Sequence, residues 1–276
     1  MLRVGPYEVS VLVADRLRLD GGAMFGAIPK TLWERSIAAD EKNRIQLVCR
    51  LLVLKSSERT VLVDLGVGRK WDQRRRDIYA IEHIVAKPLL EEVEGVTDII
   101  LTHLHFDHVG GISHIGADNR PVLSAPKARV YLNKVNWEHA HNCGLREKAS
   151  YLPENLGPLS KADLRFVGDG EEILPQIRTF FANGHTHGLC WIQVGEGTGS
   201  VVYPSDLIPM SHHVPIPYVM GYDLCAETSM LEKERFLKGA VEENWIVVFE
   251  HDPDIAAATV VRDSSGRYLI GEVVSI

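Results

Sequence analysis

The sequence predicts an α/β fold in which two packed β-sheets are flanked by helices, and three observations lead to this prediction. Short apolar runs with strand character recur from one end to the other, whereas few segments show helical periodicity. The composition, 45% hydrophobic and 24% charged, is ordinary for a chain that buries a large core. Glycine and proline are scattered and form no linker, so we expect a single domain over residues 1–276.

Eleven runs are predicted as strands, because β-branched and aromatic residues are enriched in them and turn residues flank them. They cover residues 8–14, 46–55, 60–64, 98–101, 129–132, 177–182, 190–194, 200–203, 246–250, 259–263 and 268–274. Runs of strands separated by single helices favour layered sheets covered by helices.

Helical spacing predicts three helices. The first covers residues 81–94, with Pro88 starting a new turn or a kink, and its apolar positions are Ile81, Ile84, Val85, Leu89, Leu90 and Val93. The second covers residues 228–243, and a shorter helix covers 136–142. In the second we expect capping by Thr228, Ser229 and Glu232. Its inward-facing residues are predicted to be Leu231, Phe236, Leu237 and Val241.

Two irregular segments, residues 20–40 and 207–223, are too long for simple turns. Long loops in compact domains commonly act as lids or binding loops. We therefore expect both to border a ligand site.

The net charge of −7 and the pI near 5.9 exclude a general basic field, so nucleic acid is a poor candidate partner. One dense basic run, residues 69–76, is interpreted as a solvated helix or loop face, with a phosphate site as the alternative. The apolar stretch at the N-terminus is too short for a signal peptide, and no window approaches the roughly 20 apolar residues that cross a bilayer. We expect no membrane partner.

The cysteines are widely spaced and form no CxxC pair, which indicates a reducing, cytoplasmic setting. They are Cys49, Cys143, Cys190 and Cys225. Isolated cysteines of this kind are usually small buried hydrophobic residues.

A dense group of metal-competent side chains follows the predicted strand at 98–101: His103, His105, Asp107 and His108 lie within six residues. In extended backbone, side chains at i and i+2 share a face, so His103 and His105 can converge on one ion. A turn after them would carry Asp107 and His108 toward a second ion. The HxHxDH pattern is expected by chance in roughly one chain in a thousand of this composition, so it predicts a metal site.

Three later residues directly follow predicted strands and are candidates to complete the site. They are His185, Asp206 and His251. Because strand ends can meet at one edge of packed sheets, we expect these side chains to join the 103–108 segment.

The order HxHxDH, then Gly184-His185-Thr186, then Asp206, then His251 resembles the metallo-β-lactamase superfamily over about residues 45 to 255. The resemblance implies a four-layer αβ/βα sandwich with two mixed sheets. It also implies that His103, His105 and His185 hold one ion, that Asp107, His108 and His251 hold the other, and that Asp206 bridges them. Zinc is the expected ion, with iron, manganese or cobalt as alternatives.

Asp64, in Val63-Asp64-Leu65-Gly66, matches a turn of the same superfamily. In that superfamily the aspartate of this turn usually orients a ligand histidine without binding the metal itself. The alternative is an ordinary turn aspartate.

The implied reaction is hydrolysis by a hydroxide held between two ions, with Asp206 as the proton relay and Asp107 in the same centre. The flanks, residues 19–33 and 206–223, resemble quorum-quenching N-acyl homoserine lactonases, which implies opening of a lactone or other small ester. An apolar wall for an acyl chain is predicted from Met24, Phe25, Ile28 and Trp33, with loop packing or a dimer contact as the alternative.

The resemblance to the lactonases is incomplete. Their GHTPGH pattern is altered at His187 and Leu189, and Pro209 replaces the tyrosine expected soon after the bridging aspartate. His213 and Tyr222, or else Tyr218, are the candidates to contact the substrate in its place.

Other functions remain open. A thioesterase of the glyoxalase II kind or a phosphoester hydrolase would use the same ligands, whereas β-lactam hydrolysis is disfavoured because zinc β-lactamases generally lack the residue that corresponds to Asp206. A metal-stabilised sensor of a small ligand is the non-enzymatic alternative. A homodimer is an expectation taken from relatives.

The remaining histidines lie outside the predicted set of metal ligands. His83, His139 and His141 are interpreted as surface or packing residues, and His114 and His187 as weaker candidates near the site. His212, beside His213 in the second long irregular segment, is a better candidate.

Overall fold

Two mixed β-sheets pack face to face in the computed structural model, which describes residues 2–276. The first sheet has the order β1-β2-β3-β4-β6-β9-β10, with β5 paired to β2. Its strands are β1 (Leu2–Val4), β2 (Tyr7–Asp20), β3 (Arg44–Lys55), β4 (Thr60–Val63), β5 (Glu82–His83), β6 (Asp98–Ile100), β9 (Arg129–Asn133) and β10 (Asp163–Val167). Its first four strands are antiparallel, and β4, β6, β9 and β10 run parallel.

The second sheet follows chain order from β11 to β17, and only β14 and β15 are parallel neighbours in it. Its strands are β11 (Glu171–Leu174), β12 (Ile177–Ala182), β13 (Leu189–Val194), β14 (Val201–Tyr203), β15 (Ile246–Val248), β16 (Ala257–Arg262) and β17 (Tyr268–Val273). A separate hairpin joins β7 (Ser113–Ile115) to β8 (Pro121–Leu123).

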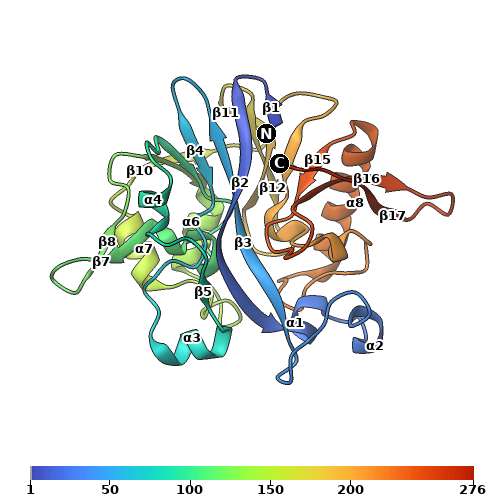
Figure 1. The fold of residues 1–276 in the computed structure, drawn as a ribbon, viewed down its shortest axis with the longest axis horizontal. Helices are drawn as coiled ribbons and strands as arrows, with labels where there is room; N and C mark the ends of the chain where they lie inside the picture. Colours follow the sequence, from blue (N-terminus) through green and yellow to red (C-terminus); the bar gives the residue numbers. More distant parts are fainter. Residues whose placement is uncertain (1) are drawn as a thin grey trace.

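Some helices lie on the outer faces of the two sheets and others lie at the end of the long β2–β3 pair, as Figure 1 shows. They are α1 (Gly21–Phe25), α2 (Lys30–Trp33), α3 (Gln73–Tyr79), α4 (Leu89–Glu92), α5 (Phe106–Val109), α6 (Lys134–His141), α7 (Pro153–Leu159) and α8 (Ala226–Glu242). Three single turns of 3₁₀ helix, η1 (Gly110–Ile112), η2 (Ser205–Leu207) and η3 (Ser211–His213), lie near the loops. Among the described residues, no helix combines the length and hydrophobicity needed to traverse a bilayer.

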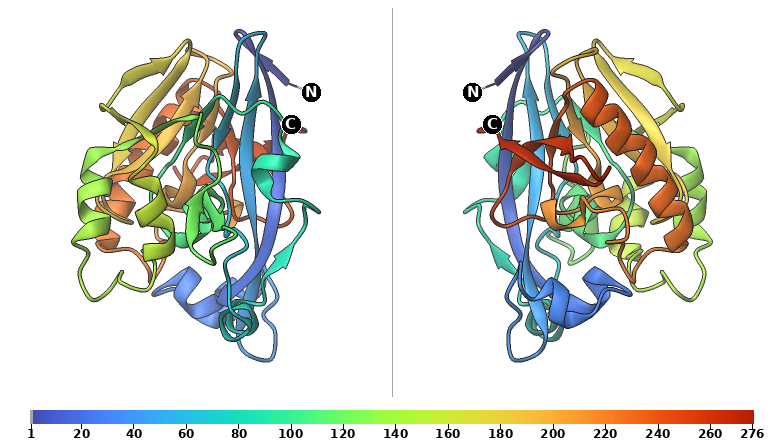
Figure 2. Two further views of the ribbon diagram at one scale, coloured as in Figure 1. Left: turned by 90° about the vertical axis from the view of Figure 1, so that its left-hand side faces the viewer. Right: turned by 90° about the vertical axis from the view of Figure 1, so that its right-hand side faces the viewer.

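Apolar side chains form one layer between the sheets and one on each outer face. Leu52 and Ile100 of the first sheet meet Ile192 and Tyr203 of the second, and all are buried. The outer face of the first sheet packs against α4, α6 and α7, and that of the second against α8 (Figure 2). The predicted four-layer αβ/βα sandwich is therefore confirmed.

All eleven predicted strands are present, several with shifted ends. The largest difference is β2, which continues to Asp20 and pairs with β3 along most of its length. The structure also contains six strands that were not predicted: β1, β5, β7, β8, β10 and β11. Most of them lie at sheet edges or in small hairpins, where the hydrophobic pattern is weak.

The prediction of a helix over 81–94 is wrong. Glu82 and His83 form strand β5 against β2, and His83 Nδ1 lies 2.7 Å from Asp15 Oδ1. Pro88 is extended with ψ 139° and precedes the short helix α4, so the segment breaks at the proline. Pairing with a neighbouring strand here overrides local periodicity.

The predicted helices over 228–243 and 136–142 are confirmed as α8 and α6, but the cap of α8 differs. Cys225 is its N-cap residue, and the side chain of Cys225 makes no capping hydrogen bond. Glu232 instead accepts hydrogen bonds from the backbone N–H groups of Asn183 and Gly184. Leu231, predicted to face inward, is 57% exposed. The basic run at 69–76 leads into α3, which buries none of its residues.

Candidate metal centre

The HxHxDH segment leaves β6 at one edge of the sandwich and turns back through α5. Extended backbone carries His103 and His105, and the helical turn that begins at Phe106 carries Asp107 and His108. A Cβ atom on Gly110 would lie 2.1 Å from the carbonyl oxygen of Val67, so only glycine lets the exit of this turn pass so close to the neighbouring loop.

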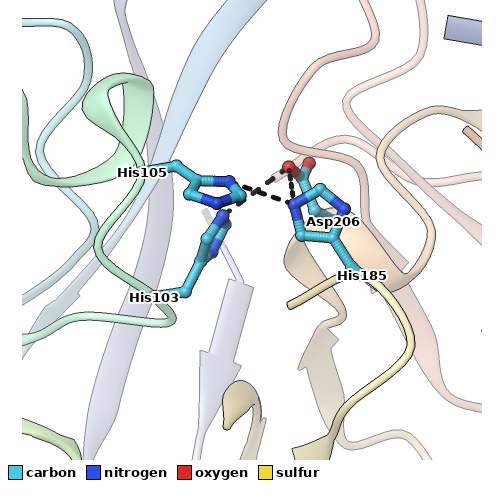
Figure 3. A group of neighbouring side chains, drawn as sticks. All are labelled: His103, His105, His185 and Asp206. Atoms are coloured by element: carbon cyan, nitrogen blue, oxygen red, sulfur yellow. Dashed lines mark hydrogen bonds and ion pairs between the residues drawn. The ribbon is translucent and has the colours of Figure 1, made fainter. Parts of the chain in front are cut away.

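The first group of donors consists of four buried side chains whose ligand atoms lie within 4.8 Å of one another. They are His103, His105, His185 and Asp206. Figure 3 shows the rings of His103 and His105 facing His185 and Asp206 across a small gap. Nε2 of His185 lies 3.2 Å from Nδ1 of His105 and 3.1 Å from Oδ2 of Asp206. Three separate strand ends therefore deliver one convergent set.

A second group lies beside the first and contains Asp107, His108 and His251. Nε2 of His108 and Nε2 of His251 are 3.4 Å apart. Asp206 also reaches this group, because its Oδ1 lies 3.1 Å from Nε2 of His251. The carboxylate of Asp206 therefore lies between the two groups.

These donors fit divalent cations. Two atoms bound to one tetrahedral zinc ion at its usual bond lengths lie about 3.4 Å apart, close to the separations found here. Nε2 of His103 and Oδ1 of Asp206 are buried, and neither has a hydrogen-bond partner among the described residues. Buried polar atoms are rarely left unpaired, so each of these atoms is available to bind a metal ion. His/Asp donors favour transition metals over calcium or magnesium.

Behind His108, Asp64 occupies the position predicted for it. Its Oδ2 lies 3.0 Å from Nδ1 of His108, and its two oxygens accept from the N–H and hydroxyl of Thr102 at 2.8 and 2.6 Å. Glu250, which the sequence does not predict, contacts the same Nδ1 at 3.1 Å. Two carboxylates therefore fix His108 with Nε2 toward the cluster.

The other ligand candidates have partners of the same kind. Nδ1 of His185 lies 2.9 Å from Oδ1 of Asp223, and Nε2 of His105 lies 3.2 Å from Oε1 of Glu147. Nδ1 of His251 lies 2.9 Å from the carbonyl oxygen of Val48. Neither the role of Asp223 nor that of Glu147 follows from the sequence, because each is remote from its histidine along the chain and has no motif of its own.

Burial and neighbouring charges shift the pKa values of the cluster. Burial, helped by the nearby His108 and His105, holds the pKa of His103 well below its usual value, so this ring is neutral as a ligand must be. Burial opposes ionisation of Asp206, but His185, His108 and His251 outweigh it and lower its pKa well below the usual range. The structure therefore places an ionised carboxylate among imidazoles.

A cavity of about 320 Å³ opens over the cluster and is lined by His105, Asp107, His185, Asp206 and His251. Its apolar wall comes from the long β2–β3 pair and the neighbouring loops, and includes Leu19, Met24, Leu47, Phe106 and Met220. Tyr79, Arg146, Ser150 and Tyr222 add polar groups. Both long irregular segments reach this cavity, as expected.

The predicted apolar wall needs correction. Met24 lines the cavity, but Phe25 and Trp33 lie behind it, stacked on each other with ring centroids 5.3 Å apart. His213 does not line the cavity either. Its ring is stacked on Phe25 at 4.9 Å and its Nε2 donates to the carbonyl oxygen of Met24 at 2.9 Å. Of the three substrate-contact candidates, His213, Tyr218 and Tyr222, the structure places only Tyr222 at the cavity.

His139 is not the surface or packing residue that the sequence suggests. Its Nε2 lies 2.6 Å from Oε2 of Glu147, the carboxylate that contacts His105. His114 is exposed and bonds to Ser124, and His187 lies against His139 with ring centroids 4.7 Å apart. His141 bonds to the carbonyl oxygen of its own helix residue Trp137.

The sandwich fold and the donor set at its edge are together those of a metallo-hydrolase. The chain belongs to the metallo-beta-lactamase superfamily, whose family model matches residues 47–251. A probable metallo-hydrolase of Mycobacterium tuberculosis is 25% identical over 240 residues, which are 76% of this chain and 73% of the relative. An N-acyl homoserine lactonase of a Bacillus species is 25% identical over 164 residues, 58% of each chain.

Solved structures show the same fold. A probable metal-dependent hydrolase from Staphylococcus aureus superposes with a TM-score of 0.87 at 23% identity, covering 99% of this chain and 100% of the other. AidC, a dizinc quorum-quenching lactonase in complex with a product, superposes with a TM-score of 0.80 at 19% identity, covering 100% of this chain and 97% of the other.

Proposed function

We propose that this protein is a dinuclear metal-dependent hydrolase that opens the ring of a lactone, with N-acyl homoserine lactones as the substrate class to test first. The proposal rests mainly on the position of Asp206. Oδ1 lies 3.1 Å from Nε2 of His251, and Oδ2 lies 3.1 Å from Nε2 of His185 and 3.4 Å from Nε2 of His108. The carboxylate therefore contacts both groups of donors, and the residue lies at the wall of a cavity with an apolar side.

This geometry supports the ligand assignment that the resemblance implies. His103, His105 and His185 would hold one ion, Asp107, His108 and His251 the other, and Asp206 would contact both. Two divalent ions bound there would supply a water activated near neutral pH and would polarise the carbonyl of the ester. A structural zinc site is normally closed by four protein ligands, whereas this shared set opens into a cavity.

The residues around the centre have separate tasks in this proposal. Asp206 orients the attacking water and carries its proton to the leaving alkoxide oxygen. Partial burial raises the pKa of Tyr222 above its usual value, so its hydroxyl stays protonated at neutral pH and can donate a hydrogen bond to the substrate carbonyl. Leu19, Met24 and Leu47 would contact the acyl part and exclude water from it.

Two relatives support the choice of a lactone. The Bacillus protein is an N-acyl homoserine lactonase, and AidC is a dizinc lactonase with an N-acyl-L-homoserine product bound. Zinc is accordingly the ion to load first.

The test is a substrate panel measured with protein freed of metal by a chelator and then reloaded with zinc, iron, manganese or cobalt. The panel contains N-acyl homoserine lactones of several chain lengths, other lactones, a thioester, a phosphodiester and a β-lactam. We expect ring opening of a lactone that depends on bound metal. The reaction is measured by titrating the acid that it releases. Faster hydrolysis of the thioester or phosphodiester would replace the proposed substrate class, and binding of lactones without turnover by any metal form would indicate a sensor instead.

A further inference from the structure

His105 presents a different ring nitrogen to the cluster from the other ligand candidates. His108, His185 and His251 face the centre with Nε2 and use Nδ1 for a partner behind them. His105 does the reverse, because its Nδ1 faces Nε2 of His185 at 3.2 Å while its Nε2 faces Oε1 of Glu147 at 3.2 Å. Its role as a ligand therefore requires the proton on Nε2 and the lone pair on Nδ1.

Glu147 is placed to impose that state. The side chain is 3% exposed and lies in the turn after α6, where its backbone N–H bonds to the carbonyl oxygen of Gly144. A carboxylate only accepts hydrogen bonds, so Oε1 requires a proton on Nε2 of His105. The ring of Tyr151, with its centroid 4.8 Å from that of His105, packs against the imidazole from the side.

His139 holds the other oxygen of the same carboxylate. Its Nε2 lies 2.6 Å from Oε2 of Glu147, and it sits on α6. The helix itself is tied to the metal loop, because Oδ1 of Asn136 accepts from the backbone N–H of Leu104 at 2.9 Å. A buried carboxylate with both oxygens engaged cannot rotate freely, so the pair His139–Glu147 forms a rigid support for His105.

We infer that Glu147 is a positioning residue that fixes the Nδ1 edge of His105 toward the metal, and that His139 acts through Glu147. The inference rests on the proposed metal centre. Outer partners of this kind commonly change metal affinity by about 10–100-fold. A Glu147→Gln change keeps the size of the side chain but offers an amide donor to at least one histidine, which favours the wrong tautomer of His105 or leaves His139 unpaired.

The experiment measures zinc binding to apoprotein by competition with a chromophoric chelator, with no activity assay involved. We expect Glu147→Gln to weaken one of two zinc equivalents by about 10–100-fold and to leave the other unchanged. The matched control is Glu138→Gln, which removes the same charge from an exposed glutamate of α6, beside His139, and should bind zinc like the wild type. His139→Ala should weaken the same equivalent, and His139→Gln, which restores a donor to Glu147, should recover most of the loss.

A second readout needs no variant. In long-range ¹H–¹⁵N spectra of the zinc-loaded wild type, the remaining ring proton of His105 should be on Nε2 and the metal on Nδ1. The inference is overturned if that proton is on Nδ1, or if folded Glu147→Gln protein binds both equivalents as tightly as the wild type. His139→Ala binding like the wild type would overturn the part assigned to His139. Wild-type protein that binds no zinc would overturn the proposed function and this inference together.

Discussion

Oδ1 of Asp206 lies 3.1 Å from Nε2 of His251. The other oxygen of the same carboxylate lies 3.1 Å from Nε2 of His185, which belongs to the other group of donors. A carboxylate offers an acceptor on each side, whereas an amide of the same shape offers an acceptor on one side and a donor on the other. The contacts of Asp206 with both groups of donors therefore require a charged carboxylate, and an amide of the same shape would not replace it.

Asp206→Asn should reduce turnover by on the order of 100-fold or more, the usual effect of removing one main electrostatic contact with the reacting atoms. Bound metal, measured on the same protein by elemental analysis, should fall as well. Asp254→Asn, which neutralises an exposed aspartate, serves as the control. Near-normal turnover by Asp206→Asn would remove the bridging role proposed for Asp206.

The parts of the site that the sequence predicts are those carried by short motifs or by strand ends. His103, His105, Asp107 and His108 are adjacent along the chain, so their proximity needs no knowledge of the fold. Parallel strands such as β14 and β15 end at the same edge, which is why Asp206 and His251 meet there. Their positions after predicted strands therefore make these residues candidates, and the family resemblance supplies their assignment to two ions.

The supporting residues could not be predicted in this way. Glu147 reaches His105 from 42 positions along the chain and Asp223 reaches His185 from 38, and neither follows a strand or matches a motif. The same reason explains the error at residues 81–94, where pairing of His83 with Asp15 on β2 decides the structure. Contacts between segments remote in sequence determine these features, and local pattern does not record them.

His213→Ala should weaken substrate binding more than it slows the reaction. The ring supports Phe25 by stacking at 4.9 Å and bonds to the carbonyl oxygen of Met24, and Met24 lines the cavity. Loss of that support should raise KM for a long-chain substrate by roughly 10-fold with little change in kcat, as expected for lost uniform binding. A short-chain substrate should be affected less. A large fall in kcat at unchanged KM would instead place His213 in the chemistry.

Stability should depend on pH through the same histidine. Burial lowers the pKa of His213 to about 3, whereas the ring in the unfolded chain titrates near 6.5. Between these values the unfolded chain binds the proton and the folded chain does not, so the free energy of unfolding falls as the pH drops from about 6.5 toward 3. Urea unfolding should show this loss in the wild type, and His213→Asn, whose side chain does not titrate, should lack part of it. Parallel pH profiles for the two proteins would contradict the prediction.

Lys233 should stabilise the loop at residues 215–222, part of which lines the cavity. This lysine of α8 is 1% exposed, and its Nζ donates to the carbonyl oxygens of Pro215, Ile216 and Tyr218 at 3.0, 3.3 and 2.7 Å. Two effects of replacing Lys233 compete. Burial of the ammonium is costly and lowers the pKa of Lys233 to about 7, so removing the charge should stabilise the fold. Removing the ammonium also takes a hydrogen-bond donor away from three carbonyl groups, which should destabilise the fold. The carbonyl oxygen of Pro215 keeps the N–H of Tyr218 as a donor, so Ile216 and Tyr218 are the carbonyls that lose their partner. An unsatisfied polar group costs about 1–3 kcal/mol when buried, and these two losses together should outweigh the relief of the buried charge.

We therefore expect Lys233→Met to lower the free energy of unfolding by about 2 kcal/mol or more and to speed hydrogen exchange in residues 215–222. Because Met220 and Tyr222 line the cavity, KM should rise at the same time. Lys238→Met is the matched control, since that lysine of the same helix is 67% exposed and pairs only loosely with Glu242 at 3.8 Å. A more stable Lys233→Met protein with unchanged exchange in the loop would show that the cost of burying the charge is the larger effect.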